Sequence, residues 1–156
     1  MNDPPPAELL RRLTPIPTYR DHPATSPHDV VGVDPHGAPC RLDVKGSAAP
    51  VLLLFLSAAC PGCLDLWHGL DAVRAALPAH VALAVVTPGP ERADAGSVAA
   101  LAPPGYPTVM SSQAFLDYRV AGPPFLVLVA ATRVRTEGVA WGVAETVRAA
   151  RAALDG

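Results

Sequence analysis

The chain has 156 residues and a mass of 16.1 kDa, the size of one domain, and it is long enough to fold without disulfides or a structural metal. Half of its residues are hydrophobic, 17% are charged and the net charge is −2, which excludes an intrinsically disordered chain. The cations are scattered, with no basic run longer than Arg11-Arg12, so we expect no nucleic-acid partner.

The beginning of the chain contains no apolar run of the length that a secretory signal needs. The most apolar window, residues 50–59, is about half as long as a transmembrane helix. We therefore expect no membrane segment and a cytoplasmic location, unless the true N-terminus lies upstream and carries an anchor or a signal. Prolines predict a flexible lead-in over residues 1–28, with one short helix at 7–13, before a folded domain over residues 29–156.

The first half of the domain has the pattern of a hairpin followed by a strand, a helix and a strand. Hydrophobic periodicity and turn residues predict these elements at residues 30–33, 38–44, 51–56, 62–77 and 81–86. A strand–helix–strand unit places its two strands parallel, with the loops at their carboxyl ends on the edge that usually faces a ligand. Cys60 lies on that edge.

The second half predicts further strands and helices of the same α/β domain. We expect a helix at 91–101, a strand at 107–110, a helix or turn at 112–120, strands at 125–130 and 134–139, and a closing helix whose apolar face runs from Val143 to Leu154. Trp141 is expected to pack beneath that closing helix. The pattern as a whole predicts an α/β fold whose central sheet is flanked by helices.

The motif Cys60-Pro61-Gly62-Cys63 joins the buried strand to the amphipathic helix. Cysteines three positions apart on a helix are neighbours, so their sulfurs can bond or separate with little backbone movement. Unpaired amides at the helix N-terminus favour a thiolate at Cys60, the candidate nucleophile, whereas Cys63 on the apolar stripe is expected to be shielded and protonated, as a resolving thiol is. Pro61 suits the first helical position and Gly62 leaves room for a substrate sulfur. Such disulfide exchange needs no cofactor and no metal.

The strand, the CxxC motif and the helix, together with the sequence YRVAGPPFLVL at residues 118–128, resemble a thioredoxin-fold protein. The resemblance implies a central mixed sheet flanked by helices. It also implies a cis-proline that packs against the CxxC motif, which maps onto Pro124 in the pair Pro123-Pro124. A proline of this kind leaves the preceding backbone free to pair with an incoming chain, so both prolines are candidate substrate-binding residues.

Within that fold, the segment FLSAACPGC at residues 55–63 is similar to the TlpA-like disulfide reductases of cytochrome maturation and to the methylamine-utilisation accessory proteins. Residues 32–44 resemble the N-terminal β-hairpin that this branch adds, and the similarity covers roughly residues 29–154. The resemblance implies a thiol-disulfide oxidoreductase. Its partners would be protein thiols or disulfides and an upstream electron donor or acceptor.

Two residues depart from the pattern of thioredoxins. Ala59 stands where they have a tryptophan, and Leu54 stands where they have a buried aspartate, so no base for Cys63 is evident, although Glu91 is a possible source. A non-catalytic redox sensor or protein-binding module therefore stays open as an alternative. A metal-binding protein is a second alternative, since CxxC is half of a zinc site, but no second CxxC or CxxH motif follows. Cys40 is interpreted as a semi-buried thiol of the hairpin.

Overall fold

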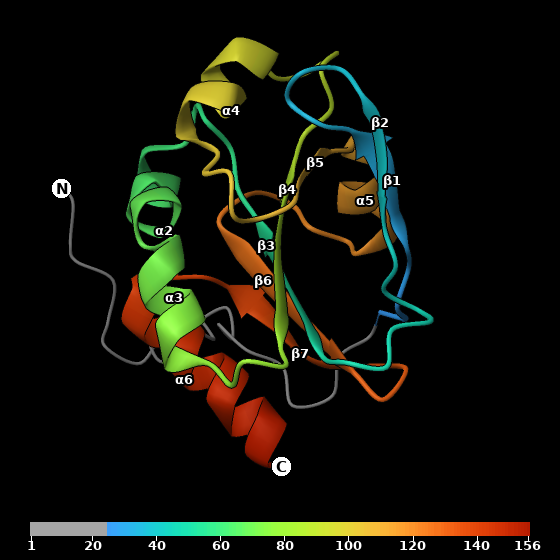
Figure 1. Ribbon diagram of the computed structural model, residues 1–156, viewed down its shortest axis with the longest axis vertical. Helices are drawn as coiled ribbons and strands as arrows, with labels where there is room; N and C mark the ends of the chain where they lie inside the picture. The colour runs from blue at the N-terminus through green and yellow to red at the C-terminus, as the bar shows by residue number, and fades with distance from the viewer. Residues whose placement is uncertain (1–24) are drawn as a thin grey trace, which may run out of the picture.

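The computed structural model describes residues 25–156, and the short helix expected at residues 7–13 lies outside them (Figure 1). Within this range one seven-stranded sheet has the order β2-β1-β5-β4-β3-β6-β7. Its strands are β1 (Val30–Val33), β2 (Pro39–Leu42), β3 (Val51–Phe55), β4 (Ala82–Thr87), β5 (Thr108–Met110), β6 (Phe125–Ala130) and β7 (Arg133–Val139). The helices are the 3₁₀ helix η1 (Pro61–Cys63), α2 (Leu64–His68), α3 (Leu70–Ala76), α4 (Ala95–Leu101), α5 (Ser112–Asp117) and α6 (Gly142–Asp155).

The sheet is mixed, with a parallel centre. Strand β3 runs parallel to β4 in the register Val51↔Ala82, and β4 runs parallel to β5, which confirms the predicted strand–helix–strand unit. Strand β6 is antiparallel to β3, and β7 is antiparallel to β6. The predicted hairpin is β1–β2, and it joins the sheet through the antiparallel pair Val33↔Met110.

Helices cover both faces of this sheet, with α2, α3 and α6 on one face and α5 on the other (Figure 1). Successive residues of a strand point to opposite faces, so Leu52 and Leu54 belong to the core beneath α2, α3 and α6, whereas Leu53 and Phe55 belong to the core beneath α5. Every residue of β3 is buried, which explains its uninterrupted apolar sequence.

The prediction of a single helix over residues 62–77 is wrong, because a break at Gly69 divides this stretch into α2 and α3. The amide of Gly69 donates to the Leu66 carbonyl oxygen at 3.1 Å instead of continuing the α-helical pattern. A Cβ atom at Gly69 would lie 2.3 Å from Cγ2 of Val143 and 2.7 Å from the carbonyl oxygen of Asp65. The close approach of α6 therefore explains both the glycine and the position of the break.

The helix predicted to begin at Glu91 begins four residues later, with α4. Asp94 caps it: the carboxylate accepts hydrogen bonds from the backbone amide of Ser97 at 3.1 Å and from its hydroxyl at 2.7 Å. A cap of this kind marks a helix start more sharply than hydrophobic periodicity does. The stretch expected as a helix or turn from residue 112 forms α5, which Ser111 caps through the Ala114 amide.

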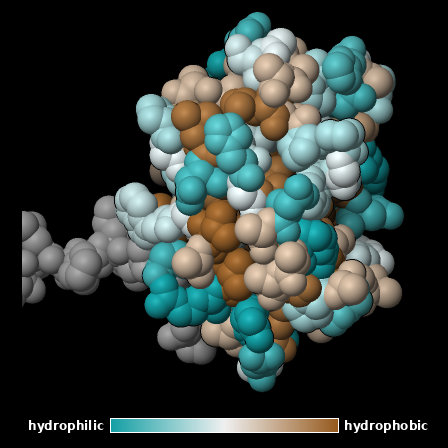
Figure 2. All heavy atoms as spheres, turned by 60° about the vertical axis from the view of Figure 1, so that its left-hand side comes forward, coloured by the Kyte–Doolittle hydropathy of each residue, from teal (hydrophilic) through white to brown (hydrophobic). Residues whose placement is uncertain are grey.

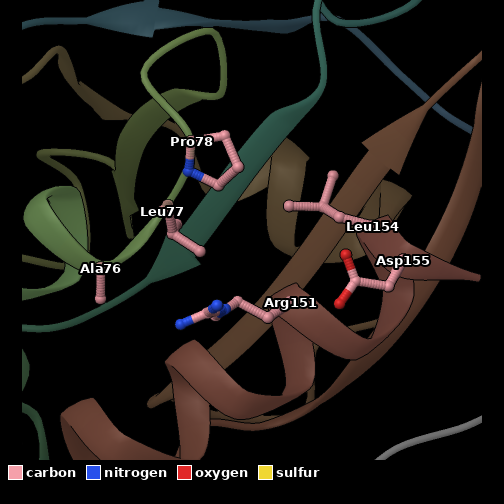
Figure 3. A pocket seen from close by; sticks show the side chains of 6 residues that line it. All are labelled: Ala76, Leu77, Pro78, Arg151, Leu154 and Asp155. Carbon is pink, nitrogen blue, oxygen red and sulfur yellow. The ribbon is translucent and has the colours of Figure 1, made fainter.

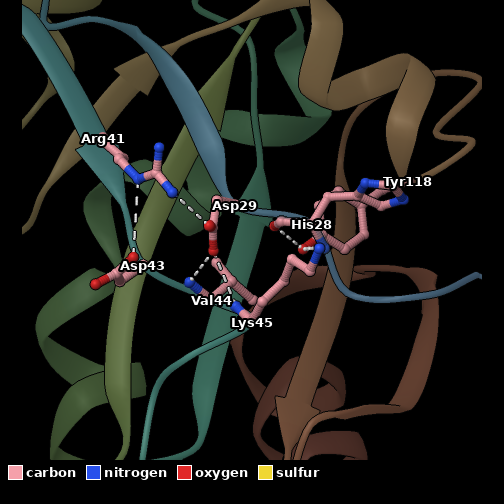
Figure 4. A network of polar contacts seen from close by, with 7 residues as sticks. All are labelled: His28, Asp29, Arg41, Asp43, Val44, Lys45 and Tyr118. Carbon is pink, nitrogen blue, oxygen red and sulfur yellow. Dashed lines mark hydrogen bonds and ion pairs between the residues drawn. The ribbon is translucent and has the colours of Figure 1, made fainter.

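Polar contacts tie the chain before β1 to the rest of the domain (Figure 4). The buried Tyr118 donates its hydroxyl to the carbonyl oxygen of His28 and accepts a hydrogen bond from the His28 amide at 2.8 Å. The Asp29 carboxylate accepts from the Val44 amide at 2.8 Å and pairs with Arg41 at 2.6 Å. These contacts fix the β1–β2 hairpin and the segment that leads into it.

Contacts with the domain begin inside the segment predicted as a lead-in. The hydroxyl of Thr25 donates to the carboxylate of Glu137 at 2.5 Å, and Glu137 is a buried residue of β7. No helix within residues 25–156 is long and apolar enough to cross a bilayer.

Candidate dithiol site

The CPGC motif follows the central strand β3 after the short segment 56–59. Cys60 occupies the N-cap position of η1 with an extended backbone, and Pro61 is the first helical residue. The amide of Cys63 donates to the carbonyl oxygen of Cys60 at 3.0 Å. Both cysteines follow the carboxyl end of β3, so they lie at the edge of the sheet where the parallel strands end.

The two cysteines differ in exposure, as the apolar stripe predicted. Cys63 is fully buried, while Cys60 is partly exposed and Pro61 and Gly62 are exposed. Burial raises the pKa of the Cys63 thiol to about 12, and its hydrogen bond to Cys60 acts in the same direction. A hydrogen bond from the Ser57 backbone opposes these effects. The inner thiol therefore keeps its proton at neutral pH.

Trp67 holds the loop between β3 and η1. Its side chain is buried, and its indole N–H donates to the carbonyl oxygen of Ser57 at 3.2 Å. Ser57 precedes Cys60 by three residues, so a residue one turn into the helix anchors the backbone that carries the motif. Nothing in the spacing of the sequence singles out this hydrogen bond.

The Gly-Pro-Pro motif meets the CxxC motif at this edge. The peptide bond between Pro123 and Pro124 is cis. Sγ of Cys60 lies 3.7 Å from the carbonyl oxygen of Pro123. A Cβ atom at Gly62 would lie 3.9 Å from Sγ of Cys60 and 3.9 Å from Cδ of Pro124. The structure thus brings together the residues that the sequence analysis singled out in two distant motifs.

A hollow with a volume of about 420 Å³ borders this site on the side of Pro123. Its lining combines apolar side chains of α5, among them Phe115 and Leu116, with the loop from Val120 to Pro123 and with Arg92. Leu116 is 71% exposed, so the hollow has an apolar rim.

Other hollows lie away from the cysteines, on the side formed by the helices. One of about 530 Å³ lies between α3 and α6, where Figure 2 shows hydrophobic residues gathered among hydrophilic ones. Another, of about 290 Å³, lies at the ends of these helices, where Arg151 extends from α6 toward Leu77 (Figure 3). Neither hollow is lined by a cysteine.

The carboxylate of the candidate base Glu91 contacts Ser112. Its exposed carboxylate accepts a hydrogen bond from the hydroxyl of Ser112, which holds the pKa of Glu91 below its usual range. Leu54 is fully buried in the core that also contains Cys63. The surroundings of the buried thiol are therefore apolar at the position where thioredoxins have their acid.

Trp141 does not pack beneath the closing helix, so that prediction is wrong. Its side chain is 63% exposed. The amide of Ala140 donates to the Pro124 carbonyl oxygen at 3.1 Å, and Gly142 turns the chain into α6 with a φ of +86°. This turn directs Val143 toward Gly69 and leaves Trp141 at the surface.

Cys40 lies apart from the other two cysteines. It belongs to the edge strand β2, which three strands separate from β3. Burial, followed by the charge of Asp34, raises the pKa of its thiol. All three cysteines are free thiols. Across residues 25–156, no three or more His, Cys, Asp or Glu side chains are grouped in a way that could hold a metal ion.

Comparison with known proteins finds solved structures that are similar to this chain. No family model and no curated protein matches the sequence. Among solved structures, a putative thiol:disulfide interchange protein DsbE from Chlorobium tepidum is similar, with 19% identity and a TM-score of 0.67 over 86% of this chain and 99% of that one. A secreted Mycobacterium tuberculosis disulfide oxidoreductase homologous to E. coli DsbE matches with 17% identity and a TM-score of 0.63, over 81% and 96%.

A third similar structure is the thioredoxin domain of a thiol-disulfide oxidoreductase from Bacteroides vulgatus. It shares 16% identity with this chain and has a TM-score of 0.65, over 84% of this chain and 96% of that one. Together with the strand order and the position of the CxxC motif, these similarities show that the chain has the thioredoxin fold. The α/β fold with a central mixed sheet, flanking helices and an N-terminal hairpin is thereby confirmed.

Proposed function

We propose that the protein is a thiol-disulfide oxidoreductase that exchanges disulfides with protein partners through Cys60 and Cys63. The observation that carries the proposal is the asymmetry of the pair: Cys60 is partly exposed beside Pro123, whereas Cys63 is fully buried, and this burial raises the pKa of its thiol. An accessible thiol that can attack and a shielded thiol that can resolve are what a two-step exchange requires. The named activities of the structurally similar proteins agree with it.

In the proposed reaction the reduced pair gives two electrons to a partner disulfide. The thiolate of Cys60 attacks one partner sulfur, the partner S–S bond breaks, and the first partner thiolate leaves. Cys63 then loses its proton and attacks the Cys60 sulfur, which closes the Cys60–Cys63 bond and releases the second partner thiolate. A dithiol donor must reduce the pair again before the next cycle. This direction agrees with the TlpA-like reductases that the sequence around Cys60 resembles.

The neighbouring residues have supporting roles in this proposal. Pro61 begins the helical turn that places Cys63 three positions after Cys60. Gly62 carries no side chain between Cys60 and Pro124, so a partner sulfur has space to approach. The backbone at Pro123 faces Cys60 and would lie alongside the partner chain while the mixed disulfide exists.

A trapping experiment tests the mechanism. The variant Cys63→Ser keeps the nucleophile and removes the resolving thiol, so it should accumulate a mixed disulfide with an oxidised protein such as insulin, visible as a mass increase that dithiothreitol reverses. Cys60→Ser should form none, and Cys40→Ser should behave as the wild type does. If Cys63→Ser forms no adduct, or if the adduct maps to Cys40, the proposed roles are wrong.

A redox sensor on the same fold is the second candidate, because Leu54 stands where thioredoxins have their buried acid. Leu54 leaves Cys63 in apolar surroundings, and Glu91 is bonded to Ser112 instead. A sensor would react with a partner disulfide once per chain and stop, whereas an oxidoreductase would turn over many times with excess dithiothreitol. Counting the equivalents of insulin reduced per chain separates these two functions.

A further inference from the structure

Three of the four exposed large hydrophobic side chains within residues 25–156 lie on segments next to Cys60 or Pro124, and Val31 on β1 does not. In the described part of the chain, the exposed large hydrophobic residues are Val31, Leu64, Leu116 and Trp141. Leu64 follows Cys63 directly, and Leu116 lines the hollow that Pro123 also lines. Trp141 follows Ala140, whose amide bonds to Pro124. Exposed apolar side chains on several segments around one point are typical of a binding surface.

Trp141 is held at this position from both sides. On one side, the amide of Ala140 donates to the Pro124 carbonyl oxygen at 3.1 Å. On the other side, the amide of Val143 faces Oδ2 of Asp65 at 3.4 Å, and Asp65 lies two residues after Cys63. The backbone on either side of the tryptophan is therefore tethered both to the Gly-Pro-Pro motif and to α2, the helix that directly follows Cys63.

The exposure of Trp141 follows from this backbone and not from loose packing. Gly142 has a φ of +86°, a conformation that favours glycine, and a Cβ atom there would lie 2.9 Å from Oδ2 of Asp65. The next residue, Val143, packs against Gly69. A largely exposed tryptophan on a tethered backbone offers a large apolar contact area, and tryptophan is enriched where interfaces concentrate their binding energy.

We propose that Trp141 binds the polypeptide of the substrate protein next to the disulfide that Cys60 attacks, and that it contacts an apolar side chain there. This inference rests on the proposed thiol-disulfide exchange and deepens it, because it assigns a residue that selects protein disulfides over small ones. Ala59 leaves no aromatic side chain immediately before Cys60. Trp141 supplies one from the loop between β7 and α6, on the Pro124 side of the site.

Steady-state kinetics on two substrates test the role of Trp141. Trp141→Ala should lower kcat/KM for insulin about five- to tenfold, the loss expected when one aromatic anchor is truncated. The rate with 2-hydroxyethyl disulfide, which has no polypeptide for the indole to contact, should stay within about twofold of the wild type. Trp141→Phe should recover most of the insulin activity. The matched control is Val31→Ala. Val31 is also exposed and apolar, but it lies on β1, toward the edge of the sheet opposite to β7.

Fluorescence gives a readout that does not depend on turnover. The chain has two tryptophans, and Trp67 is already buried. When Cys63→Ser traps a cystine-containing peptide, Trp141 should move to a drier environment, so the emission should shift to shorter wavelength and acrylamide should quench it less. Cys63→Ser combined with Trp141→Phe should show no such change.

The outcomes separate this inference from the function on which it rests. If Trp141→Ala resembles Val31→Ala on insulin, or if it lowers the rates on both substrates alike, the assigned role of Trp141 is overturned while the exchange reaction stands. A wild-type protein that reduces neither substrate overturns the exchange reaction, and the role of Trp141 falls with it.

Discussion

Gly69 lies so close to Val143 that even a methyl group on the glycine would come within 2.3 Å of Cγ2 of the valine. This contact joins the break between α2 and α3 to the first turn of α6. It brings the helix that carries Cys63 against the helix that follows Trp141. The relative position of two sides of the candidate site therefore depends on a residue with no side chain.

Replacing Gly69 with alanine should destabilise the fold. The new methyl group would also lie 2.7 Å from the Asp65 carbonyl oxygen, so the backbone would have to move. Overpacking of this kind costs about 1–3 kcal/mol, more than the roughly 1 kcal/mol that alanine gains over glycine in a helix. Urea unfolding of the reduced protein measures the difference.

The control for that substitution is Gly46→Ala, because a Cβ atom at Gly46 would meet nothing within 4 Å. Its unfolding midpoint should stay near that of the wild type. Adding Val143→Ala to Gly69→Ala should recover part of the loss, since it removes the clashing methyl group. Equal midpoints for Gly69→Ala and Gly46→Ala would show that the contact does not constrain the helices.

Tyr118→Phe should destabilise the domain by about 1–3 kcal/mol, because the buried hydroxyl both donates to and accepts from the backbone of His28. The matched control is Tyr106→Phe, which removes a hydroxyl that bonds to Asp71 near the surface and should change the midpoint little. Equal effects of the two substitutions would mean that the hydrogen bonds between Tyr118 and His28 add no more stability than the one between Tyr106 and Asp71.

The same tyrosine predicts a loss of stability at alkaline pH. Burial raises the pKa of Tyr118 to about 12, whereas a tyrosine in an unfolded chain has a pKa of about 10. Because the folded state holds the proton more tightly, the contribution of Tyr118 is complete below pH 10 and is lost as the pH rises toward 12. Unfolding midpoints between pH 9 and 11 should fall less steeply for Tyr118→Phe than for the wild type.

Resolution of the mixed disulfide should accelerate steadily with pH. Cys63 must ionise before it attacks. Its pKa is raised to about 12, and burial of the thiol is the largest cause of this shift. The thiolate fraction therefore grows about tenfold per pH unit through the neutral range. Stopped-flow release of a peptide thiol from the preformed adduct should give a straight line in log rate from pH 7 to 9. A plateau near neutral pH would reveal a base that ionises Cys63.

The three cysteines should react with iodoacetamide in a fixed order. Cys60 is accessible at the N-cap of η1 and should be modified first, and Cys63 should be last because it is fully buried. Cys40 should be intermediate, because it is partly exposed but burial raises the pKa of its thiol. Mass spectrometry of timed samples at pH 7 gives the order directly. Modification of Cys63 ahead of Cys60 would contradict the proposed roles.

Much of the fold could be predicted because its signals are local. The apolar run at residues 51–56 is a strand buried on both faces, and it became β3. The break at Gly69 could not be predicted, since its cause is a contact with Val143, which is distant in the sequence. The exposure of Trp141 escaped prediction for the same reason: the turn at Gly142 depends on tertiary contacts with Asp65.

The candidate site was predictable as two motifs but not as one geometry. The spacing of Cys60 and Cys63 marks a reactive pair, and the Gly-Pro-Pro motif precedes a strand. That Sγ of Cys60 lies 3.7 Å from the Pro123 carbonyl oxygen is a property of the assembled sheet. The same limit applies to Glu91, whose hydrogen bond to Ser112 joins the loop before α4 to the first residue of α5.

Cys60 and Pro123 are 63 positions apart in the chain, and between them lie η1, α2, α3, β4, α4, β5 and α5. A ribosome must therefore synthesise nearly half of the described chain after the first cysteine before the second half of the site exists. Contacts of such long sequence separation form late and slowly. A nascent or truncated chain would expose CPGC without its partner loop, so recovery of thiol exchange after refolding would report that β6 has docked beside β3.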